Sequence, residues 1–380
     1  MKFFSEFVLV YAIIPIMYGE RGHVSAAGIG IIFGLGLTLS VVLEIPTGII
    51  ADKIPRKYVL MASIFLKILA LLTWLAFPYF RGYLVAATLF ALSESSESGT
   101  LQAYLYGALG DDNKMGFGKF WARVSAMVMI SYTLAYVLTT IIGINYPLLL
   151  MLSIIPVIAA FLICLFLPTD TLANSSGEVK PKIFASAVNH IKNSPELIKL
   201  IVGGVIVVSL AEVMIEYLSL YYHQVGVATR FVPIMMAIGN TLGAVSFWSL
   251  HAWERTLNKW KILLLILVSL LFVASFMGGV ATAVIGILLF TRFVRVLQVQ
   301  YESNIQHLAN DEARATISSI GSFASSFLGA GIMASVGLFA ANNSVVRPIR
   351  VALLAGALVY LLLQLFNKHR QNALVVLETK

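Results

Sequence analysis

The chain of 380 residues is 59% hydrophobic and only 12% charged, and its mean hydropathy is +0.90. A soluble domain carries about 25% charged residues, so this composition excludes a soluble domain despite the net charge of +8. At about 20 residues per membrane span plus short loops, the length has room for about twelve transmembrane helices. The single cysteine, Cys164, excludes an intrachain disulfide.

Apolar stretches recur along the whole chain and predict an all-α polytopic membrane protein. The first stretch is long, contains Pro15 and is followed by no small-residue cleavage site, so it is predicted to be a span and not a signal peptide. The predicted spans cover residues 4–19, 27–51, 58–78, 83–109, 120–143, 146–168, 196–222, 229–250, 261–278, 281–307, 315–341 and 346–366.

The basic residues are distributed unevenly between the two sides of these spans. With both termini on one side, that side receives 18 of the 26 Lys and Arg residues, the other side receives 5, and 3 fall within spans. Positive charge concentrates in cytoplasmic loops, so both termini are predicted to be cytoplasmic. The excess charge therefore reflects topology and some attraction for membrane lipid, and no nucleic-acid partner is expected.

The longest hydrophilic stretch, Pro168–Ser194, divides the chain near its middle. It predicts an N-terminal six-helix bundle over 1–168, a cytoplasmic linker over 169–194 and a C-terminal six-helix bundle with a short tail over 195–380. Apolar residues at helical spacing between 183 and 191 predict a short interfacial helix in the linker. Six spans, a linker and six spans indicate two bundles related by pseudo-twofold symmetry.

The loop after the second span carries a motif of glycine, an acid and bases. It reads Gly48-x-x-x-Asp52-Lys53-x-Pro55-Arg56-Lys57 and resembles the loop signature of the major facilitator superfamily, except that Pro55 replaces a glycine. "EIPTG" from Glu44 and "ARAT" from Ala313 resemble segments of bacterial members. The resemblance implies that Gly48, Asp52, Lys53, Arg56 and Lys57 form a gating latch on the cytoplasmic side.

Charged residues inside the predicted spans each need a reason, because one costs at least ~2.5–3.5 kcal/mol near the membrane centre. In the resembled family, spans 1, 4, 7 and 10 line the central cavity, and seven in-span charges fall in spans 4, 7 and 10. Five carboxylates there face only two arginines, so the surplus is expected to bind protons. The predicted proton-coupling residues are Glu94, Glu97, Glu212 and Glu216.

Substrate contacts are predicted from the same helices. Arginines do not lose their protons, so they must pair with carboxylates or bind an anionic group. Polar and aromatic residues on spans 1, 4, 7 and 10 complete the set. The predicted substrate-binding residues are Arg292, Arg295, Glu302, Gln298, Tyr11, Tyr217, Gln102 and His223.

Two further charges, Glu44 and Lys67, lie about 12–15 Å from the cytoplasmic ends of adjacent spans at about 1.5 Å per residue. Their similar depth predicts a structural ion pair between them.

These patterns favour a secondary transporter over an enzyme, since no phosphate-binding loop, zinc spacing or nucleophile–base arrangement is present. No cofactor or metal is expected; the expected partners are a small-molecule substrate, protons and lipid, for a monomer in a bacterial inner membrane. The first prediction is proton-coupled efflux of small amphipathic or chelating molecules by antiport. The alternative is a proton-coupled importer of an anionic nutrient or siderophore-like chelate, and a receptor or scaffold without transport is a third class.

Overall fold

The computed structural model describes residues 1–108, 117–169, 191–308 and 314–378, and side chains for most of them. Within these ranges the chain consists of helices joined by short connections, without a β-strand. The interfacial helix predicted in the linker lies almost entirely outside the described residues.

The first predicted span is an interrupted helix. It consists of α1 (Lys2–Ser5), the 3-10 helix η1 (Leu9–Ile13) and α2 (Ile14–Glu20). The Leu9 N–H donates to Ser153 Oγ at 2.9 Å, and the Leu9 carbonyl accepts from Thr139 Oγ1 at 2.8 Å. In a membrane, backbone groups released by a break must be paired within the protein, so these side chains stabilise the interruption.

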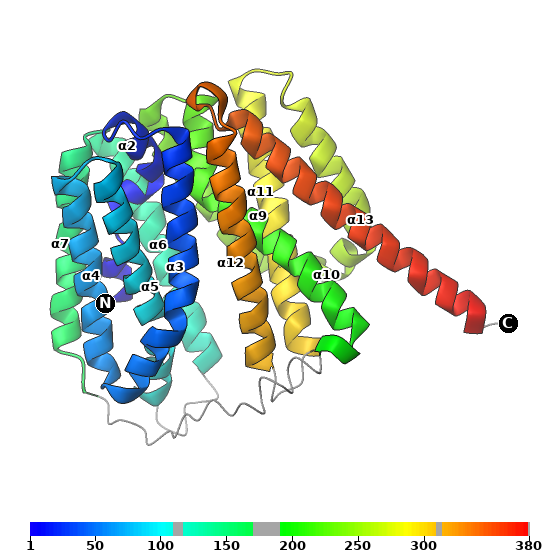
Figure 1. Cartoon of the computed structure of the whole chain (residues 1–380), viewed down its shortest axis with the longest axis horizontal. Coiled ribbons are helices and arrows are strands. Elements are labelled where there is room, and N and C mark those ends of the chain that lie inside the picture. The colour runs from blue at the N-terminus through cyan, green and yellow to red at the C-terminus, as the bar shows by residue number, and fades with distance from the viewer. Residues whose placement is uncertain (109–116, 170–190, 309–313, 379–380) are drawn as a thin grey trace. The chain divides into compact units, whose positions relative to one another are not determined.

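Five longer helices complete the N-terminal half (Figure 1). They are α3 (Ala26–Lys53), α4 (Arg56–Ala76), α5 (Phe80–Ala108), α6 (Phe117–Ile142) and α7 (Tyr146–Leu165). α4 packs against α5 and α7, α3 packs against α5, and α1 packs against α6 and α7. Side-chain caps begin two of these helices: Ser25 accepts from the Gly28 N–H, and Asn145 accepts from the Leu148 N–H.

The C-terminal half differs from the predicted spans in one place. Its elements are α9 (Pro195–Gln224), η3 (Thr229–Phe231), α10 (Val232–Ala274), α11 (Val280–Leu308), α12 (Arg314–Leu338), η4 (Ala341–Asn343) and α13 (Val346–Glu378). The predicted eighth and ninth spans form one continuous helix, α10, because residues 250–260 contain neither proline nor glycine to end it.

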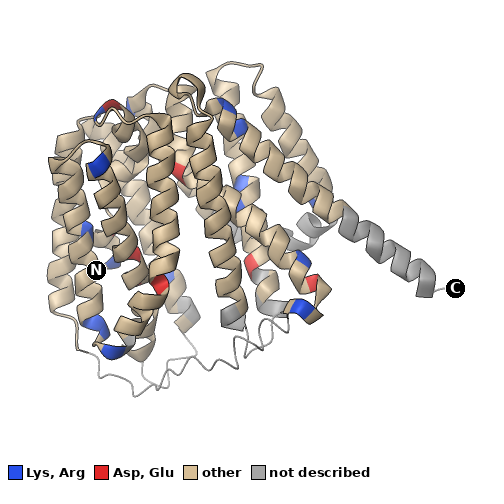
Figure 2. Cartoon of the chain, viewed as in Figure 1, with Lys and Arg blue, Asp and Glu red and all other residues tan. Residues whose placement is uncertain are grey.

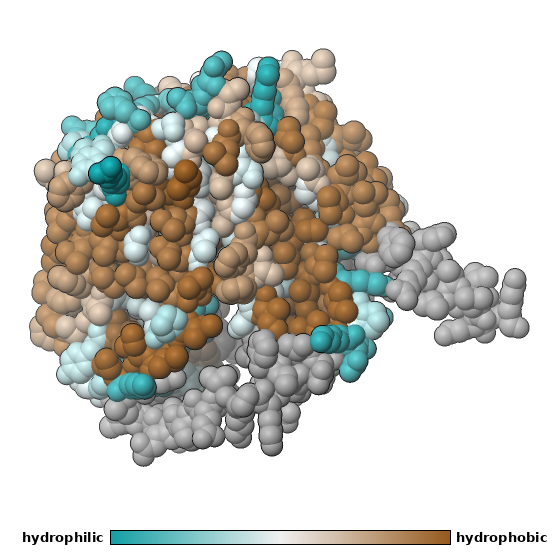
Figure 3. Space-filling model, viewed as in Figure 1, coloured by the Kyte–Doolittle hydropathy of each residue, from teal (hydrophilic) through white to brown (hydrophobic). Residues whose placement is uncertain are grey.

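Nine helices among the described residues are long and apolar enough to cross a membrane, and Trp260–Ala274 is a shorter apolar helix. Figure 3 shows hydrophobic residues over most of the described helix surfaces. Figure 2 shows that few charged residues interrupt them. The predicted fold class, an all-α polytopic membrane protein, is confirmed.

The chain divides into two compact units. Unit 1 comprises residues 1–178, 216–241 and 333–344, and unit 2 comprises residues 179–215, 242–332 and 345–380. Unit 1 therefore holds the predicted N-terminal bundle together with two segments from the C-terminal half. The predicted boundary at 169–194 stays a prediction.

Within unit 1, α3 and the end of α12 cross at two glycines. A Cβ added to Gly30 would lie 2.6 Å from the Met333 carbonyl oxygen and 3.1 Å from the Gly337 Cα. A Cβ added to Gly337 would lie 2.5 Å from the Ala26 carbonyl oxygen. Backbone cannot move as a flexible side chain can, so both positions require glycine for this close approach.

Unit 2 has a small hydrophobic core built around Tyr301 of α11. Leu197, Ile201, Ile305 and Ile317 are buried with it. This core brings α9, α11 and α12 together, so the polar residues of these helices keep fixed positions within the unit.

Candidate functional site

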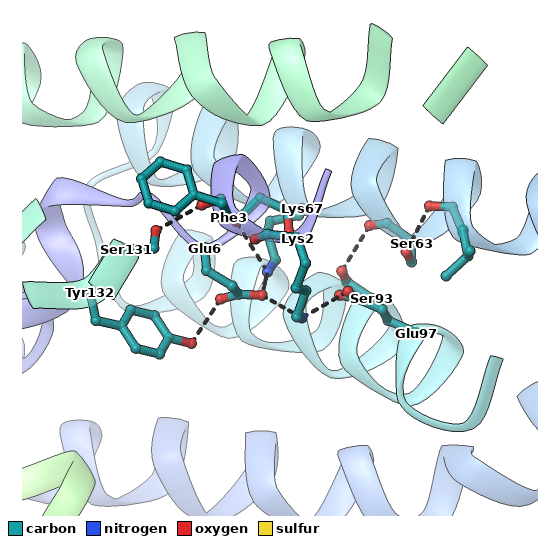
Figure 4. A network of polar contacts seen from close by, with 11 residues as sticks. Lys2, Phe3, Glu6, Ser63, Lys67, Ser93, Glu97, Ser131 and Tyr132 are labelled. Atoms are coloured by element: carbon teal, nitrogen blue, oxygen red, sulfur yellow. Dashed lines mark hydrogen bonds and ion pairs between the residues drawn. The ribbon is translucent and has the colours of Figure 1, made fainter. Parts of the chain in front are cut away.

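A network of charged side chains lies inside unit 1 at the interrupted first helix, and Figure 4 shows it from close by. The Glu6 Oε1 atom is 2.7 Å from Lys2 Nζ and 2.8 Å from Lys67 Nζ. Lys2 Nζ also lies 2.7 Å from Glu97 Oε1. The Tyr132 hydroxyl donates to Glu6 Oε2 at 2.8 Å. We call these five residues the N-terminal charge network.

The network is enclosed by protein. Glu6 is 5% exposed, Lys67 is 2% exposed and Glu97 is 5% exposed. Lys67 also donates to the Ser5 carbonyl at 3.4 Å. Buried charges are tolerated where they are paired and hydrogen-bonded, so the two lysines compensate Glu6 and Glu97.

Two hydrogen bonds from serine side chains to backbone carbonyls lie beside the network, one between α6 and α1 and one between α5 and α4. Ser131 of α6 donates to the Phe3 carbonyl at 2.7 Å, and Ser93 of α5 donates to the Ser63 carbonyl of α4 at 2.8 Å. Figure 4 shows both contacts flanking the charged side chains. The short α1 helix therefore presents Lys2 and Glu6, one turn apart, to α4 and α5.

Glu94 lies one helical turn before Glu97 on α5 but has a different environment. Its side chain is exposed, and it accepts one long hydrogen bond, from Ser40 Oγ at 3.5 Å. It interacts electrostatically with Lys67, Glu6, Lys2 and Glu97, but it forms no ion pair among the described residues. Three carboxylates in this part of unit 1 thus share two lysines, and Glu94 is the one without its own cation.

The predicted Glu44–Lys67 pair is wrong. Lys67 pairs with Glu6, and Glu44 on α3 is exposed. The prediction matched the two residues by depth along their helices. Depth does not fix the direction in which a side chain leaves its helix, and a residue near the N-terminus occupies the position next to Lys67.

In unit 2, α11 carries a row of polar side chains at helical spacing. Arg295 Nη1 donates to Gln298 Oε1 at 2.8 Å, and Gln298 Nε2 donates to Glu302 Oε1 at 3.1 Å. Glu302 is exposed. The structure therefore joins three of the predicted substrate-binding residues into one chain of hydrogen bonds.

Arg292 and Glu212 belong to the same unit. The Arg292 guanidinium lies over Gly243, where an added Cβ would be 2.6 Å from Nη1. Glu212 interacts electrostatically with Arg295 and also contacts Ser326. The Glu212 Oε2 atom is buried without a hydrogen-bond partner among the described residues. One carboxylate oxygen next to an arginine thus remains available to a proton or a ligand.

Glu216 and Tyr217 of α9 belong to unit 1. Glu216 is half-buried and interacts electrostatically with Tyr18, Tyr136 and Tyr217. Tyr217 is 1% exposed, and its hydroxyl donates to the Met333 carbonyl at 2.9 Å. No surface of Tyr217 is left for a substrate, so the predicted contact is corrected to a packing role.

His223, another predicted substrate contact, has protein partners of its own, and its predicted role stays a prediction. Its ring lies 3.7 Å from Glu20 Oε1 and 3.1 Å from Thr229 Oγ1. Tyr146 donates to the other Glu20 oxygen at 2.6 Å. His223 thus belongs to a polar cluster at the C-terminal end of α2. The remaining predicted contacts are Tyr11, which is half-buried, and Gln102, which is exposed.

The loop between α3 and α4 contains the predicted gating residues. Lys57 Nζ donates to the Leu165 carbonyl at 2.6 Å, so it caps the C-terminus of α7 inside unit 1. Lys53 is exposed, Arg56 is half-buried, and Gly48 has open space where a Cβ would point. The Asp52 side chain lies outside the described residues. Lys57 therefore has a structural role within its own unit, and the gating role of the loop stays a prediction.

Comparison with known proteins decides the family. The family model described as Major Facilitator Superfamily matches residues 1–334. The chain belongs to the major facilitator superfamily. The resemblance inferred from the loop motif is confirmed, and the chain is a membrane transporter, not an enzyme.

One relative of this superfamily member has a low sequence identity to it. An uncharacterized MFS-type transporter of Bacillus subtilis, YxaM, is 21% identical over 230 residues, which is 57% of this chain and 56% of the relative. The match thus spans a little over half of that relative's length.

Solved structures of superfamily transporters share the fold. The nucleoside transporter NupG, in a mutant form, has a TM-score of 0.78 at 13% identity and covers 95% of this chain and 96% of its own. An inward-facing bacterial homolog of the lysosomal transporter Spinster has a TM-score of 0.70 at 13% identity, covering 96% and 93%. A D-xylose–proton symporter has a TM-score of 0.69 at 11% identity, covering 94% of each chain. These likenesses show the fold alone.

Three residues of the charge network, Lys2, Glu6 and Tyr132, were not among the predicted site residues. Lys2 counted only as a loop charge, and Glu6 lay at the edge of the first predicted span. Their spacing was the available signal, because an acid and a base four residues apart meet on one helix face. Among the described residues, no group of three or more His, Cys, Asp or Glu side chains could hold a metal ion.

Proposed function

We propose that this transporter is a proton-coupled antiporter that exports small amphipathic or chelating molecules, and that Glu94 carries the coupled proton. The supporting observation is the charge balance of unit 1. Lys2 and Lys67 compensate Glu6 and Glu97, whereas Glu94 is exposed and has no ion pair among the described residues.

Glu94 combines the two properties that proton coupling requires. A carboxylate inside a span is stable only when it faces protein or water, because lipid does not solvate it. The exposed fraction of Glu94 therefore faces an aqueous path along which protons reach it. With both nearby lysines engaged by other acids, binding a proton removes an uncompensated negative charge.

Glu97, Glu212 and Glu216 keep secondary places in the proposal. Glu97 holds Lys2, so loss of this ion pair would alter the charge beside Glu94. Glu212 lies near Arg295 and has a free oxygen among the described residues, which suits a second proton or a ligand group. The protein would act as a monomer in the bacterial inner membrane, with both termini cytoplasmic according to the positive-inside rule.

Arg295 and Arg292 support the second candidate, an importer of an anionic nutrient or siderophore-like chelate. Both are half-buried on α11, and Arg295 presents its guanidinium beside Gln298 and Glu302. A bidentate arginine is suited to carboxylate groups. Import and export differ in the direction in which the substrate moves relative to protons.

Flux in proteoliposomes under an imposed pH gradient tests the proposal. The substrate probes are tetraphenylphosphonium, an aromatic cation, and ferric citrate, an anionic chelate. The antiporter accumulates tetraphenylphosphonium in the acidic compartment, whereas the importer accumulates ferric citrate in the alkaline one. Glu94→Gln should abolish the gradient dependence, and Glu44→Gln, an exposed acid on α3, should keep it. Gradient-driven flux of wild-type size in Glu94→Gln would refute the role of Glu94.

A further inference from the structure

Four aromatic side chains form a continuous surface in unit 1, on three different elements. Tyr11 of η1 lies 6.2 Å from Phe90 of α5 and 6.0 Å from Tyr132 of α6, measured between ring centroids. Tyr132 and Tyr136, one turn apart on α6, are stacked at 6.2 Å with an interplanar angle of 16°. We call these four rings the aromatic surface.

The aromatic surface differs from the aromatic core beneath it. Trp74 packs on Phe90 at 4.6 Å and is 2% exposed, and Tyr18, which packs on Trp74, is also 2% exposed. All four rings of the aromatic surface, by contrast, are half-buried. They therefore rest on the core and leave one side uncovered within unit 1.

This surface does not have the surroundings of a lipid-facing one. The Tyr132 hydroxyl points to Glu6, as Figure 4 shows, and Glu6 is 5% exposed. Tyr11 interacts electrostatically with Glu6, Glu94 and Glu97. Glu6 and Glu97 face protein, whereas Glu94 is exposed and at this depth must face water and not lipid. The uncovered side of the rings beside Glu94 is therefore inferred to face the same water.

The charges that face the rings are predominantly negative. Glu94 acts on Tyr11 from α5, and Glu216 acts on Tyr136 from α9. The groups that interact with Glu94 itself are Lys67, Glu6, Lys2 and Glu97, and Ser40 contributes a hydroxyl from α3. The two lysines are engaged by Glu6 and Glu97, so Glu94 adds a negative charge beside the rings that neither lysine pairs with among the described residues.

The geometry points to a binding subsite for an organic cation that carries aromatic rings, with Tyr11, Phe90, Tyr132 and Tyr136 as its platform and Glu94 as its counter-ion. This inference rests on the proposed function and specifies its substrate class. Ring faces attract cations and stack on other rings, and a carboxylate within the same surface adds a charge that the cation neutralises.

The subsite couples cation and proton by competition. When Glu94 is ionised, it attracts the organic cation, and when it binds a proton, that attraction is lost. A cation and a proton therefore exclude each other at one carboxylate. Alternating occupancy of this kind is the requirement for exchange of a substrate against a proton.

Equilibrium binding to the purified full-length protein in detergent tests the subsite without transport. The probe is radiolabelled tetraphenylphosphonium, and the matched control is tetraphenylborate, which has the same shape and opposite charge. We expect saturable binding of the cation that weakens as the pH falls, and no saturable binding of the anion. Equal binding of both ions would overturn the inference, because it would reflect hydrophobic area alone.

Binding of the same probe to variants of the aromatic surface tests which residues form the subsite. Tyr136→Leu and Tyr11→Leu should each weaken binding roughly tenfold, by the size of a partly desolvated cation–π contact, whereas Tyr11→Phe, which keeps the ring, should bind nearly as wild type. Tyr136 lies on α6 and not on the interrupted helix that holds Tyr11, so its variant guards against loss of folding at Tyr11. Glu94→Gln should remove the pH dependence. Wild-type affinity in both leucine variants would overturn the subsite.

The two proposals fail in different ways. If the leucine variants bind the probe normally while Glu94→Gln loses gradient-driven flux, the aromatic subsite is wrong and the proton role of Glu94 stands. If binding depends on the rings while Glu94→Gln keeps wild-type coupling, the subsite stands and the proposed proton carrier is wrong.

Discussion

Lys67 offers the sharpest test of the charge network, because its replacement leaves a buried carboxylate without one of its two cations. Lys67 is 2% exposed and lies 2.8 Å from Glu6, which is 5% exposed. Removing one partner of a buried ion pair costs about 3–5 kcal/mol. Lys2 remains 2.7 Å from the same Glu6 oxygen, so Lys67→Met should cost about 3 kcal/mol, the lower end of that range.

The assay is thermal unfolding of the purified protein at fixed detergent concentration and scan rate. For a compact unit of 150–250 residues, ~3 kcal/mol corresponds to a Tm lowered by roughly 6–12 °C. The double variant Glu6→Gln/Lys67→Met should recover most of this loss, since both charges are then absent. Lys53→Met, at an exposed position, is the control and should change stability by less than about 0.5 kcal/mol. Equal Tm values for Lys67→Met and Lys53→Met would refute the reasoning.

Two further predictions concern packing and helix capping in unit 1. Gly30→Val places a Cβ 2.6 Å from the Met333 carbonyl oxygen, so it should lower stability by about 1–3 kcal/mol in the same thermal assay. The control is Gly99→Ala, whose added Cβ meets nothing within 4 Å and should change stability little. Equal effects of the two variants would contradict the close crossing of α3 and α12. Lys57→Met removes the donor to the Leu165 carbonyl and should lower the free energy of unfolding by about 0.5–1.5 kcal/mol. The pH dependence of transport should stay unchanged. Loss of transport in a protein of normal stability would instead support the predicted gating role.

The sequence was sufficient for the class and outline of the fold because these depend on composition and hydrophobic length. Spans of about 20 apolar residues and the hydrophilic stretch after Pro168 are properties of the chain itself. The boundary between the predicted eighth and ninth spans is not marked by a break in the helix. Charged residues near 254–261 interrupt the apolar pattern, but charge alone does not end a helix, and α10 continues through them.

The candidate site was predicted less completely, and the misses share a physical cause. Glu94 and Glu97 could be assigned to one face of one helix from their spacing. Which cation each acid meets depends on how helices are rotated against one another, and sequence spacing does not specify that rotation. Lys67 was therefore paired with Glu44 instead of Glu6.

The interrupted first helix explains why the charge network itself was missed. A regular span over 4–19 would leave Lys2 outside the membrane and Glu6 at its edge. The break between α1 and η1 instead directs both residues into unit 1, where Lys2 reaches Glu97. Tyr217 failed as a substrate contact for a related reason, since polar side chains on a span were assumed to face a cavity, whereas Tyr217 is buried and its hydroxyl donates to the Met333 carbonyl.

The central claim is that Glu94 is the acid whose proton exchanges with substrate, and substrate-driven proton movement measures it most directly. Proteoliposomes containing a pH-sensitive dye start without a pH gradient and receive external tetraphenylphosphonium, with protein-free liposomes as the baseline. Wild type and Glu44→Gln should make the interior alkaline as the cation enters, and Glu94→Gln should not. Alkalinisation at the wild-type rate in Glu94→Gln would contradict the claim.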